Sequence, residues 1–178
     1  MAATVLATRR LTVRSWRDED VEPLAAIGTD LEVVRYLRGV PWSIEDAAQI
    51  VAQNRDVEAS TGVTMWALED RGSGTLVGYC GFAPTNAACL RPDLIEIGWA
   101  LDRHRWGEGL ATEAAVGVMP VGLDLFGPGR IVAKCHIDNS ASERVMRRVG
   151  LRRVGVFRAF DDSTIVCRFP ASYRSPAE

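Results

Sequence analysis

The sequence has little lysine, little histidine and no paired cysteine motif. A single lysine, Lys134, stands among 21 basic residues, far from the glycine-rich turn near residue 107. This excludes a Walker phosphate loop, which needs Gly-Lys-Ser/Thr at its turn. The cysteines form no C-x-x-C pair and share no ligand spacing with His104 or His136; they are Cys80, Cys89, Cys135 and Cys167. We therefore expect neither a disulfide framework nor a metal site.

Long apolar runs and one-sided charge are also missing. No apolar run approaches the roughly 20 residues of a membrane span. The first ten residues lack the basic region and apolar core of a secretory signal. The formal net charge is −2, which gives no general attraction to nucleic acid or to an anionic membrane. These absences favour a cytoplasmic protein with neither kind of partner.

The composition is that of an ordinary globular protein. The chain has 178 residues, of which 47% are hydrophobic and 25% charged, enough for one core. No repeat or low-complexity linker divides it, so we expect a single domain over residues 1–178. Only residues 1–8 and 172–178, at the two ends of the chain, are expected to be loose.

The order of apolar patterns predicts a mixed α/β protein. Strands are expected at 11–14, 63–69, 75–82, 93–101, 130–137, 154–160 and 163–169. Helices are expected from Asp18 or Asp20 to Ile27, over 31–37, from Ile44 toward Glu58 and over 109–126. Pro120 falls inside the last of these helices and predicts a kink or a break there, because it removes an N–H and crowds the carbonyl of Val116.

The most informative segment is the turn at residues 106–114, Trp-Gly-Glu-Gly-Leu-Ala-Thr-Glu-Ala. It joins a predicted strand to a predicted helix, so the free N–H groups at the helix start would face an anion. Gly107, Gly109 and Ala111 leave room for a close approach. A Rossmann fingerprint would need a third glycine where Thr112 stands. Glu113 is expected to be an ordinary carboxylate of the first helical turn.

A second motif follows downstream. After the strand over 130–137, Asn139 and Ser142 begin a short helix that ends before Gly150. Both residue types also suit a plain helix cap and a plain helix end, so this pattern has a structural explanation as well.

Together the two motifs resemble the GNAT acetyltransferases, in particular the RimJ/RimL-type branch. That branch has W-G-x-G-x-A-T-E-A in the loop and N-x-x-S before a short helix. Trp106 stands where most of the family has Gln or Arg. The resemblance spans about residues 9–168. It implies an α/β (α+β) GNAT fold with a mixed, mostly antiparallel sheet of about six to seven strands, flanked by helices, and a splayed central strand pair.

The resemblance also implies acyl transfer from acetyl-CoA. The backbone of the loop would hold the pyrophosphate, through Trp106, Gly107, Glu108, Gly109, Leu110, Ala111 and Thr112. The strand residues Trp99, Ala100 and Leu101 would offer backbone groups to the pantetheine arm, at a bulge that Gly98 suits. Asn139 would bind the pantetheine amide. Acceptors would be a small-molecule amine or a protein N-terminus, and a homodimer is plausible.

The catalytic residues are less directly indicated. Many GNAT enzymes have a tyrosine acid where this chain has Met146, so Ser142 is expected to assist the departing thiolate. An alternative is that coenzyme A leaves without an acid. Glu96 is the first candidate for the base, because strand alternation separates it from Ile95 and Ile97; a cross-strand pairing is the structural alternative. His136 is the second candidate base.

The acceptor pocket would be formed by variable segments. Tyr36 and Trp42 could line an apolar slot, and Asp161 could attract a cationic amine. Core packing of Trp42 and a simple turn at Asp161 are the structural alternatives, and they are favoured for these single residues. Two functions therefore remain open. The first is an N-acetyltransferase, and the second is a catalytically silent domain that binds coenzyme A and regulates.

Overall fold

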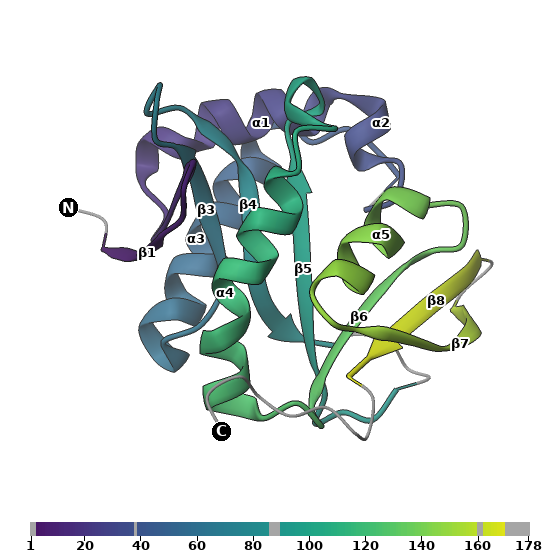
Figure 1. The fold of residues 1–178 in the computed structure, drawn as a ribbon. Coiled ribbons are helices and arrows are strands. Elements are labelled where there is room, and N and C mark those ends of the chain that lie inside the picture. Colours follow the sequence, from purple (N-terminus) through teal and green to yellow (C-terminus); the bar gives the residue numbers. More distant parts are fainter. Residues whose placement is uncertain (1–2, 38, 86–89, 160–161, 170–178) are drawn as a thin grey trace.

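The protein is built on one eight-stranded sheet (Figure 1). The computed structural model describes residues 3–37, 39–85, 90–159 and 162–169, with the backbone alone at 157–159, 162–163 and 165. The strand order is β1-β2-β3-β4-β5-β6-β8-β7. The strands are β1 (Thr4–Ala7), β2 (Leu11–Arg14), β3 (Met65–Asp70), β4 (Leu76–Pro84), β5 (Ile95–Leu101), β6 (Ile131–His136), β7 (Arg152–Ala159) and β8 (Asp162–Arg168).

The expected mixed, mostly antiparallel sheet is confirmed. Among the described residues, β5 and β6 form the parallel pair and the other neighbouring strands are antiparallel. The sheet has one strand more than expected, because β1 pairs with β2. The expectation of a loose end therefore fails at Thr4–Ala7, which adds a short edge strand. Residues 172–178 lie outside the described part.

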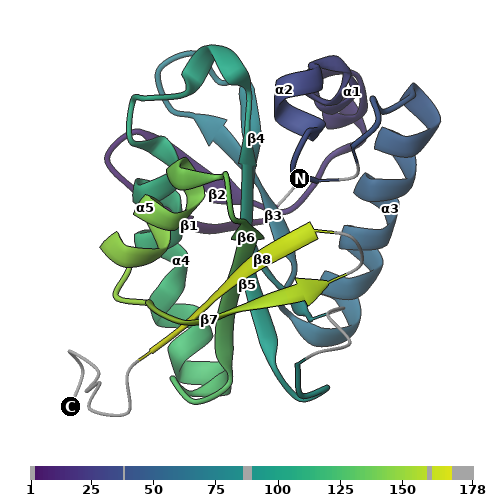
Figure 2. The same cartoon turned by 90° about the vertical axis from the view of Figure 1, so that its right-hand side faces the viewer.

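Helices cover both faces of the sheet (Figure 2). One face carries α4 (Leu110–Phe126) and α5 (Ser140–Arg148); the other carries α1 (Val21–Thr29), α2 (Leu31–Val34) and α3 (Ile44–Thr61). Local sequence explains the ends of α3. Ser43 and Asp46 form a reciprocal capping box at its start, and Gly62 ends it at φ +76°, a conformation that glycine adopts readily. In the part of the chain that the structure describes, no helix has the length and apolarity to cross a membrane.

Each face has its own hydrophobic core. The larger core lies under α4 and α5, and the smaller one lies under α1 to α3. Trp42 belongs to the smaller core and is only 4% exposed. Its ring packs so closely on Gly28 that an added Cβ there would come within 2.2 Å of it. The structure therefore supports core packing for Trp42 rather than a place in an acceptor slot.

Of the kink or break predicted at Pro120, the break does not occur. Helix α4 runs without interruption from Leu110 to Phe126 with Pro120 inside it. Val116 and Pro120 both lie on its exposed side. Water can therefore reach the carbonyl group that proline leaves without a partner, which reduces the cost of the missing hydrogen bond.

The central strands β5 and β6 separate soon after they meet. Their pairing consists of Ile95 with Ile131 and Glu96 with Val132. Beyond Glu96 the two strands diverge, as expected for a splayed pair. The expected bulge near Gly98 is not found, since β5 keeps an unbroken register with β4 from Ile95 to Leu101. The region beside the second half of β5, where β6 no longer pairs with it, is here called the opening.

Candidate active site at the opening between strands β5 and β6

Backbone groups of β5 face this opening. The N–H of Ile95 donates to the Arg130 carbonyl, 2.9 Å away on the β6 side. Because backbone direction alternates along a strand, the polar backbone groups of Trp99 and Leu101 also point toward β6, where they have passed the paired region. Ala100 is oriented differently. Its carbonyl oxygen lies only 2.1 Å from a Cβ built on Gly78 of β4, so its backbone faces away from the opening.

The glycine-rich turn lies beyond the end of β5. Gly107 and Gly109 both have φ +81°, and Gly109 is the N-cap of α4. Within the described chain, the N–H groups of residues 107–112 donate no hydrogen bond to the protein. Unpaired N–H groups at the start of a long helix favour an anion. The turn therefore has the geometry of a cradle for a diphosphate.

Trp106 fastens this turn to β5. Its indole Nε1 donates to the Leu101 carbonyl at 2.9 Å, while 47% of the residue remains exposed. The tryptophan that replaces the more usual Gln or Arg thus holds the loop against the strand. It also occupies one of the acceptor sites that Leu101 was expected to offer to the pantetheine arm.

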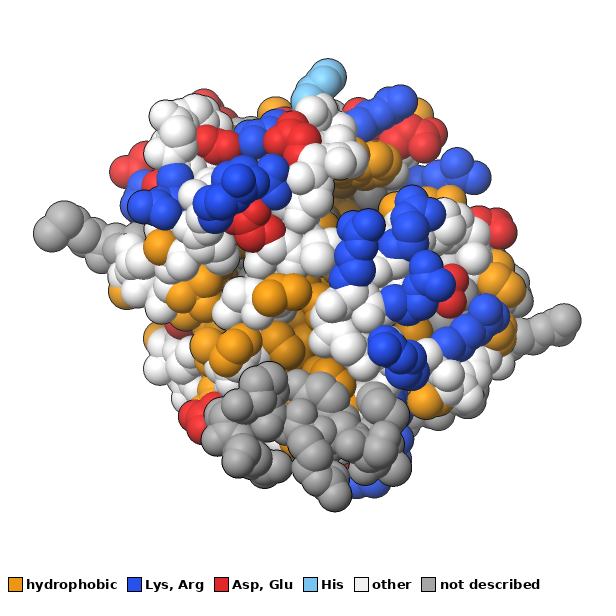
Figure 3. All heavy atoms as spheres, viewed as in Figure 1, with side chains coloured by type: hydrophobic (Ala, Val, Ile, Leu, Met, Phe, Trp, Pro, Cys, Tyr) orange, Lys and Arg blue, Asp and Glu red, His pale blue; other side chains and the backbone are white. Residues whose placement is uncertain are grey.

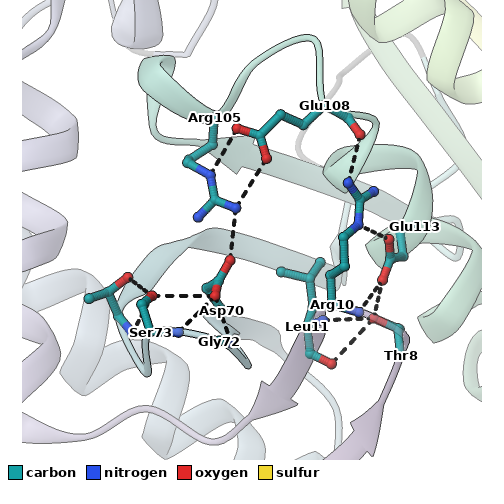
Figure 4. A network of polar contacts seen from close by, with 10 residues as sticks. Thr8, Arg10, Leu11, Asp70, Gly72, Ser73, Arg105, Glu108 and Glu113 are labelled. Carbon is teal, nitrogen blue, oxygen red and sulfur yellow. Dashed lines mark hydrogen bonds and ion pairs between the residues drawn. The ribbon is translucent and has the colours of Figure 1, made fainter.

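Glu108 is one of the residues whose backbone forms the cradle, and its carboxylate is paired with an arginine (Figure 4). Arg105 donates through Nε and Nη2 to the two Glu108 oxygens, at 3.0 and 3.1 Å. The same Nη2 donates to Asp70 at 2.8 Å. These hydrogen bonds lower the pKa of Glu108, and they lower the pKa of Asp70 to about 2. Arg105 pairs directly with the Glu108 carboxylate and ties the loop to the β3–β4 turn through Asp70.

Glu113 has a structural role of the kind expected. It accepts hydrogen bonds from the Thr8 hydroxyl (2.6 Å) and from the N–H and Nε of Arg10 (both 2.7 Å). Burial raises the pKa of Glu113, but these hydrogen bonds outweigh it and the pKa is lowered. The Nη1 of Arg10 also donates to the Glu108 carbonyl at 3.0 Å. The turn between β1 and β2 is therefore joined to the first turn of α4 (Figure 4).

Basic side chains lie beside α5 on the same face of the molecule. Figure 3 shows apolar surface near the middle of this face, with Lys and Arg side chains on the α5 side. The exposed arginines of α5 and the start of β7 are Arg144, Arg147, Arg148, Arg152 and Arg153. A positive field near the cradle favours an anionic ligand.

The start of α5 places Asn139 and Ser142, the residues of the second motif, directly after the end of β6. Asn139 is the N-cap of α5, and its Oδ1 accepts the N–H of Ser142 at 3.0 Å. Both residues are half-buried. Met146, one turn further, is 1% exposed and lies in the larger core. The Met146 side chain therefore packs in the larger core and does not face the opening.

On the other face of the sheet, Glu96 pairs with Lys134. The Lys134 Nζ lies 2.9 Å from Glu96 Oε2, and their side chains are 23% and 18% exposed. Burial raises the pKa of Glu96, and the nearby ammonium only partly opposes this. A carboxylate with a raised pKa is suited to accept a proton near neutral pH.

His136 lies further along the same face of β6. Its ring stacks on Tyr36, with ring centroids 5.4 Å apart and an interplanar angle of 25°. Its Nδ1 accepts the N–H of Asp138 at 3.1 Å. The segment after α2 is thereby brought next to the end of β6, although the two are about 100 residues apart in sequence.

The opening therefore brings together most, not all, of the expected residues. Glu96, His136 and Tyr36 lie on one face of the sheet, and the loop, Asn139 and Ser142 lie toward the other. Trp42 is in the core, and Asp161 lies outside the described residues. Sequence reasoning missed Lys134, although a lone lysine two residues after Val132 in a buried strand is unusual enough to suggest a paired charge.

A metal centre finds no support in the described part of the chain, where no group of His, Cys, Asp and Glu could hold an ion. Cys80, Cys135 and Cys167 are buried and unbridged, as expected of small apolar residues.

A separate concavity of about 1200 Å³ near β2 and α3 is lined by charges that pair with one another, such as Arg14 with Asp20 at 2.7 Å.

Comparison with known proteins identifies the family and the fold. Residues 10–152 match the family described as Acetyltransferase (GNAT) domain. The uncharacterised N-acetyltransferase YoaA of Bacillus subtilis (strain 168) is 30% identical over 158 residues, covering 88% of this chain and 87% of YoaA. Among solved structures, the GNAT-family acetyltransferase from Bacillus anthracis has a TM-score of 0.77 at 24% identity, covering 94% of this chain and 96% of that one.

A further solved structure, RimL, the ribosomal L7/L12 alpha-N-protein acetyltransferase in complex with coenzyme A, has a TM-score of 0.70 at 18% identity. The match covers 94% of this chain and 98% of the RimL chain. At this identity the likeness concerns the fold. The family match, the YoaA similarity and the cradle at the start of α4 agree, and the chain belongs to the GNAT family of acetyl-CoA-dependent acyltransferases.

Proposed function

We propose that this protein transfers an acetyl group from acetyl-CoA to the nitrogen of a primary amine. The observation that carries the proposal is the opening between β5 and β6. The cradle is at the start of α4 on one face of the sheet, and Glu96, His136 and Tyr36 lie on the other face beside the same two strands. A donor and an acceptor that enter from opposite faces would meet there, which is the positioning that a bimolecular transfer needs.

The residues around the opening fit a coenzyme A thioester, which when bound supplies an activated acetyl group. The N–H groups of residues 107–112 would hold its diphosphate. The backbone groups of Trp99 and Leu101 would bind the pantetheine arm and polarise the thioester carbonyl, as preorganised N–H groups do for an oxyanion. Asn139 would bind the pantetheine amide.

Glu96 is the residue we assign as base. Its carboxylate would take one proton from the amine while the nitrogen forms a bond to the acetyl carbon and the carbon–sulfur bond breaks. Ser142 would donate a hydrogen bond to the departing sulfur, which leaves as the thiolate, and the proton on Glu96 would return to solvent. His136 is less suited as a base in this geometry, because its Nδ1 lone pair already accepts the N–H of Asp138.

The acceptor class is proposed from the surroundings of Tyr36. The Tyr36–His136 stack forms one wall of the acceptor side, and Leu37, Val40 and Ile137 are exposed apolar residues near it in sequence. A flat and partly apolar wall suits a peptide N-terminus or a small amine with an apolar group. The RimL likeness supports the first of these. The cytoplasmic location, a homodimer and a single domain over the whole chain remain predictions.

Titration calorimetry with acetyl-CoA, followed by a thiol-release assay against amines and short peptides, tests the proposal. We expect binding together with thiol release for one acceptor class. Binding without release from any acceptor would instead support the silent regulatory domain. Absence of binding would overturn the assignment of the cradle.

A further inference from the structure

Lys134, one member of an ion pair at the opening, has no role in the chemistry proposed above. The Lys134 Nζ lies 2.9 Å from Glu96 Oε2, and both side chains are less than one quarter exposed. Lys134 is the one lysine of the chain. Solvent screens a partly buried pair less than an exposed one, so each charge acts strongly on the other.

The strand register explains how the pair forms. Glu96 is opposite Val132, at the last paired position of β5 and β6. Lys134 is two residues further along β6 and therefore on the same face as Glu96. At Lys134 the strand β6 no longer pairs with β5. The Lys134 side chain extends across the opening to the Glu96 carboxylate. The pair thus spans the two strands at the point where they separate.

We infer that Lys134 is a positioning residue for acyl transfer: its ammonium keeps the Glu96 carboxylate ionised and directed into the opening, ready to take the proton of the amine. This inference rests on the proposed role of Glu96 as base. The proton balance is simple. Glu96 gains the proton that the amine loses, and Lys134 takes no part in the transfer.

The surroundings of Glu96 make such a residue necessary. Burial alone raises the pKa of the Glu96 carboxyl, whereas the Lys134 charge and hydrogen bond lower it. From β4, Ala83 and Pro84 stand beside it without charge. From β3, Met65 packs against Gly98. His136 is the next titratable side chain on the same face of β6. Without Lys134 more of the carboxyl would be protonated near neutral pH, and it would be inactive as a base.

The test compares Lys134→Met with Lys134→Arg in the full chain. For one acceptor, the pH dependence of kcat/KM is measured for each variant and for the unaltered protein. The acceptor's own titration is common to all three and drops out of the comparison. Removing the charge should move the acidic limb upward by about 1–3 pH units. At pH values below the midpoint of the shifted limb, kcat/KM of Lys134→Met should be at least tenfold lower than that of the unaltered protein. At pH values above the midpoint, the two values should agree. Arginine should leave the limb within a few tenths of a unit.

Glu96→Gln separates this inference from the proposed function. If Glu96→Gln removes the limb but Lys134→Met leaves it in place, Lys134 has no positioning role and Glu96 is still the base. If Glu96→Gln leaves the limb in place, the base assignment fails and the inference fails with it. A shift in Lys134→Met that is absent in the Glu96→Gln background supports both.

A direct titration guards against a folding defect. The carboxyl 13C signal of Glu96, assigned by its loss in Glu96→Gln, should titrate at a higher pH in Lys134→Met than in the unaltered protein. Lys134→Gln serves where Lys134→Met does not fold, and it keeps a hydrogen-bond donor without the charge. An unchanged titration midpoint in a folded variant would overturn the inference.

Discussion

The two sides of the opening between β5 and β6 are built in different ways. The cofactor side uses backbone N–H groups from one short segment, residues 107–112, at the start of α4. The acceptor side uses side chains from three distant segments, which meet as the Glu96–Lys134 pair and the Tyr36–His136 stack. A site made of backbone depends on local conformation, whereas a site made of side chains depends on the register of the sheet. Mutations on the two sides should therefore have different kinetic effects.

The largest effect is expected at Gly109. Its φ of +81° is unfavourable for other residues, and a tryptophan side chain would also occupy the cradle. Gly109→Trp should weaken acetyl-CoA binding more than 100-fold in a calorimetric titration. Gly62→Trp is the matched control, since Gly62 has φ +76° and open space at the end of α3. Equal losses of binding in both variants would show that strain, rather than the cradle, is responsible.

Glu96→Gln should have the next largest effect, and on kcat rather than on cofactor affinity. A positioned base contributes about 10²–10⁴-fold. Because burial raises the pKa of Glu96 and the base must be ionised, the rate of the unaltered protein should fall as the pH falls through that raised pKa. The variant should lose this limb. A pH–rate profile that keeps the limb would point to another base or to water.

Ser142→Ala should reduce kcat by about tenfold and leave the affinity for acetyl-CoA nearly unchanged, because a hydrogen bond to a departing thiolate acts mainly in the transition state. The cap of α5 should survive, since the Ser142 group that binds Asn139 is the backbone N–H. Ser140→Ala, in the same helical turn, is the control. An equal loss in both variants would indicate a general defect of α5.

The same contrast explains what the sequence could predict. The glycine-rich turn at the start of α4, the α5 cap and the alternation of Glu96 with Ile95 and Ile97 are local patterns, and the structure has each of them at the predicted residues. The Glu96–Lys134 pair depends on how strands more than 30 residues apart align and separate, which no local pattern contains. The sequence resemblance supplied the splay, but it also suggested a bulge that β5 does not have.

At two other positions packing outweighed local preference. Trp42 stands in a loop where an exposed aromatic would suit an acceptor slot, yet Gly28 leaves space for its ring in the smaller core. Pro120 disfavours helix, yet α4 continues through it, since Ala114, Ala115, Val118 and Met119 are held in the larger core on its other side. The short strand Thr4–Ala7 could not be read because it is stabilised by pairing with β2 and not by its own pattern.

The smallest effect on catalysis is expected at Glu113, although it lies within the loop motif. Glu113→Gln loses the charge that accepts from Thr8 and Arg10, and should lower the free energy of unfolding by about 1–3 kcal/mol. Because the pKa of Glu113 is lowered in the folded state, this stabilisation is present above its unfolded value and is lost as the pH falls through the folded value. Urea unfolding at pH 7 and at pH 3 should therefore show a smaller difference between variant and unaltered protein at the lower pH.

The affinity of Glu113→Gln for acetyl-CoA should change only severalfold, because the carboxylate contacts Thr8 and Arg10 and its substitution leaves the N–H groups of the loop in place. A loss of binding as large as that of Gly109→Trp would mean that the cradle is maintained by this side-chain network, and that the two sides of the opening differ less than proposed.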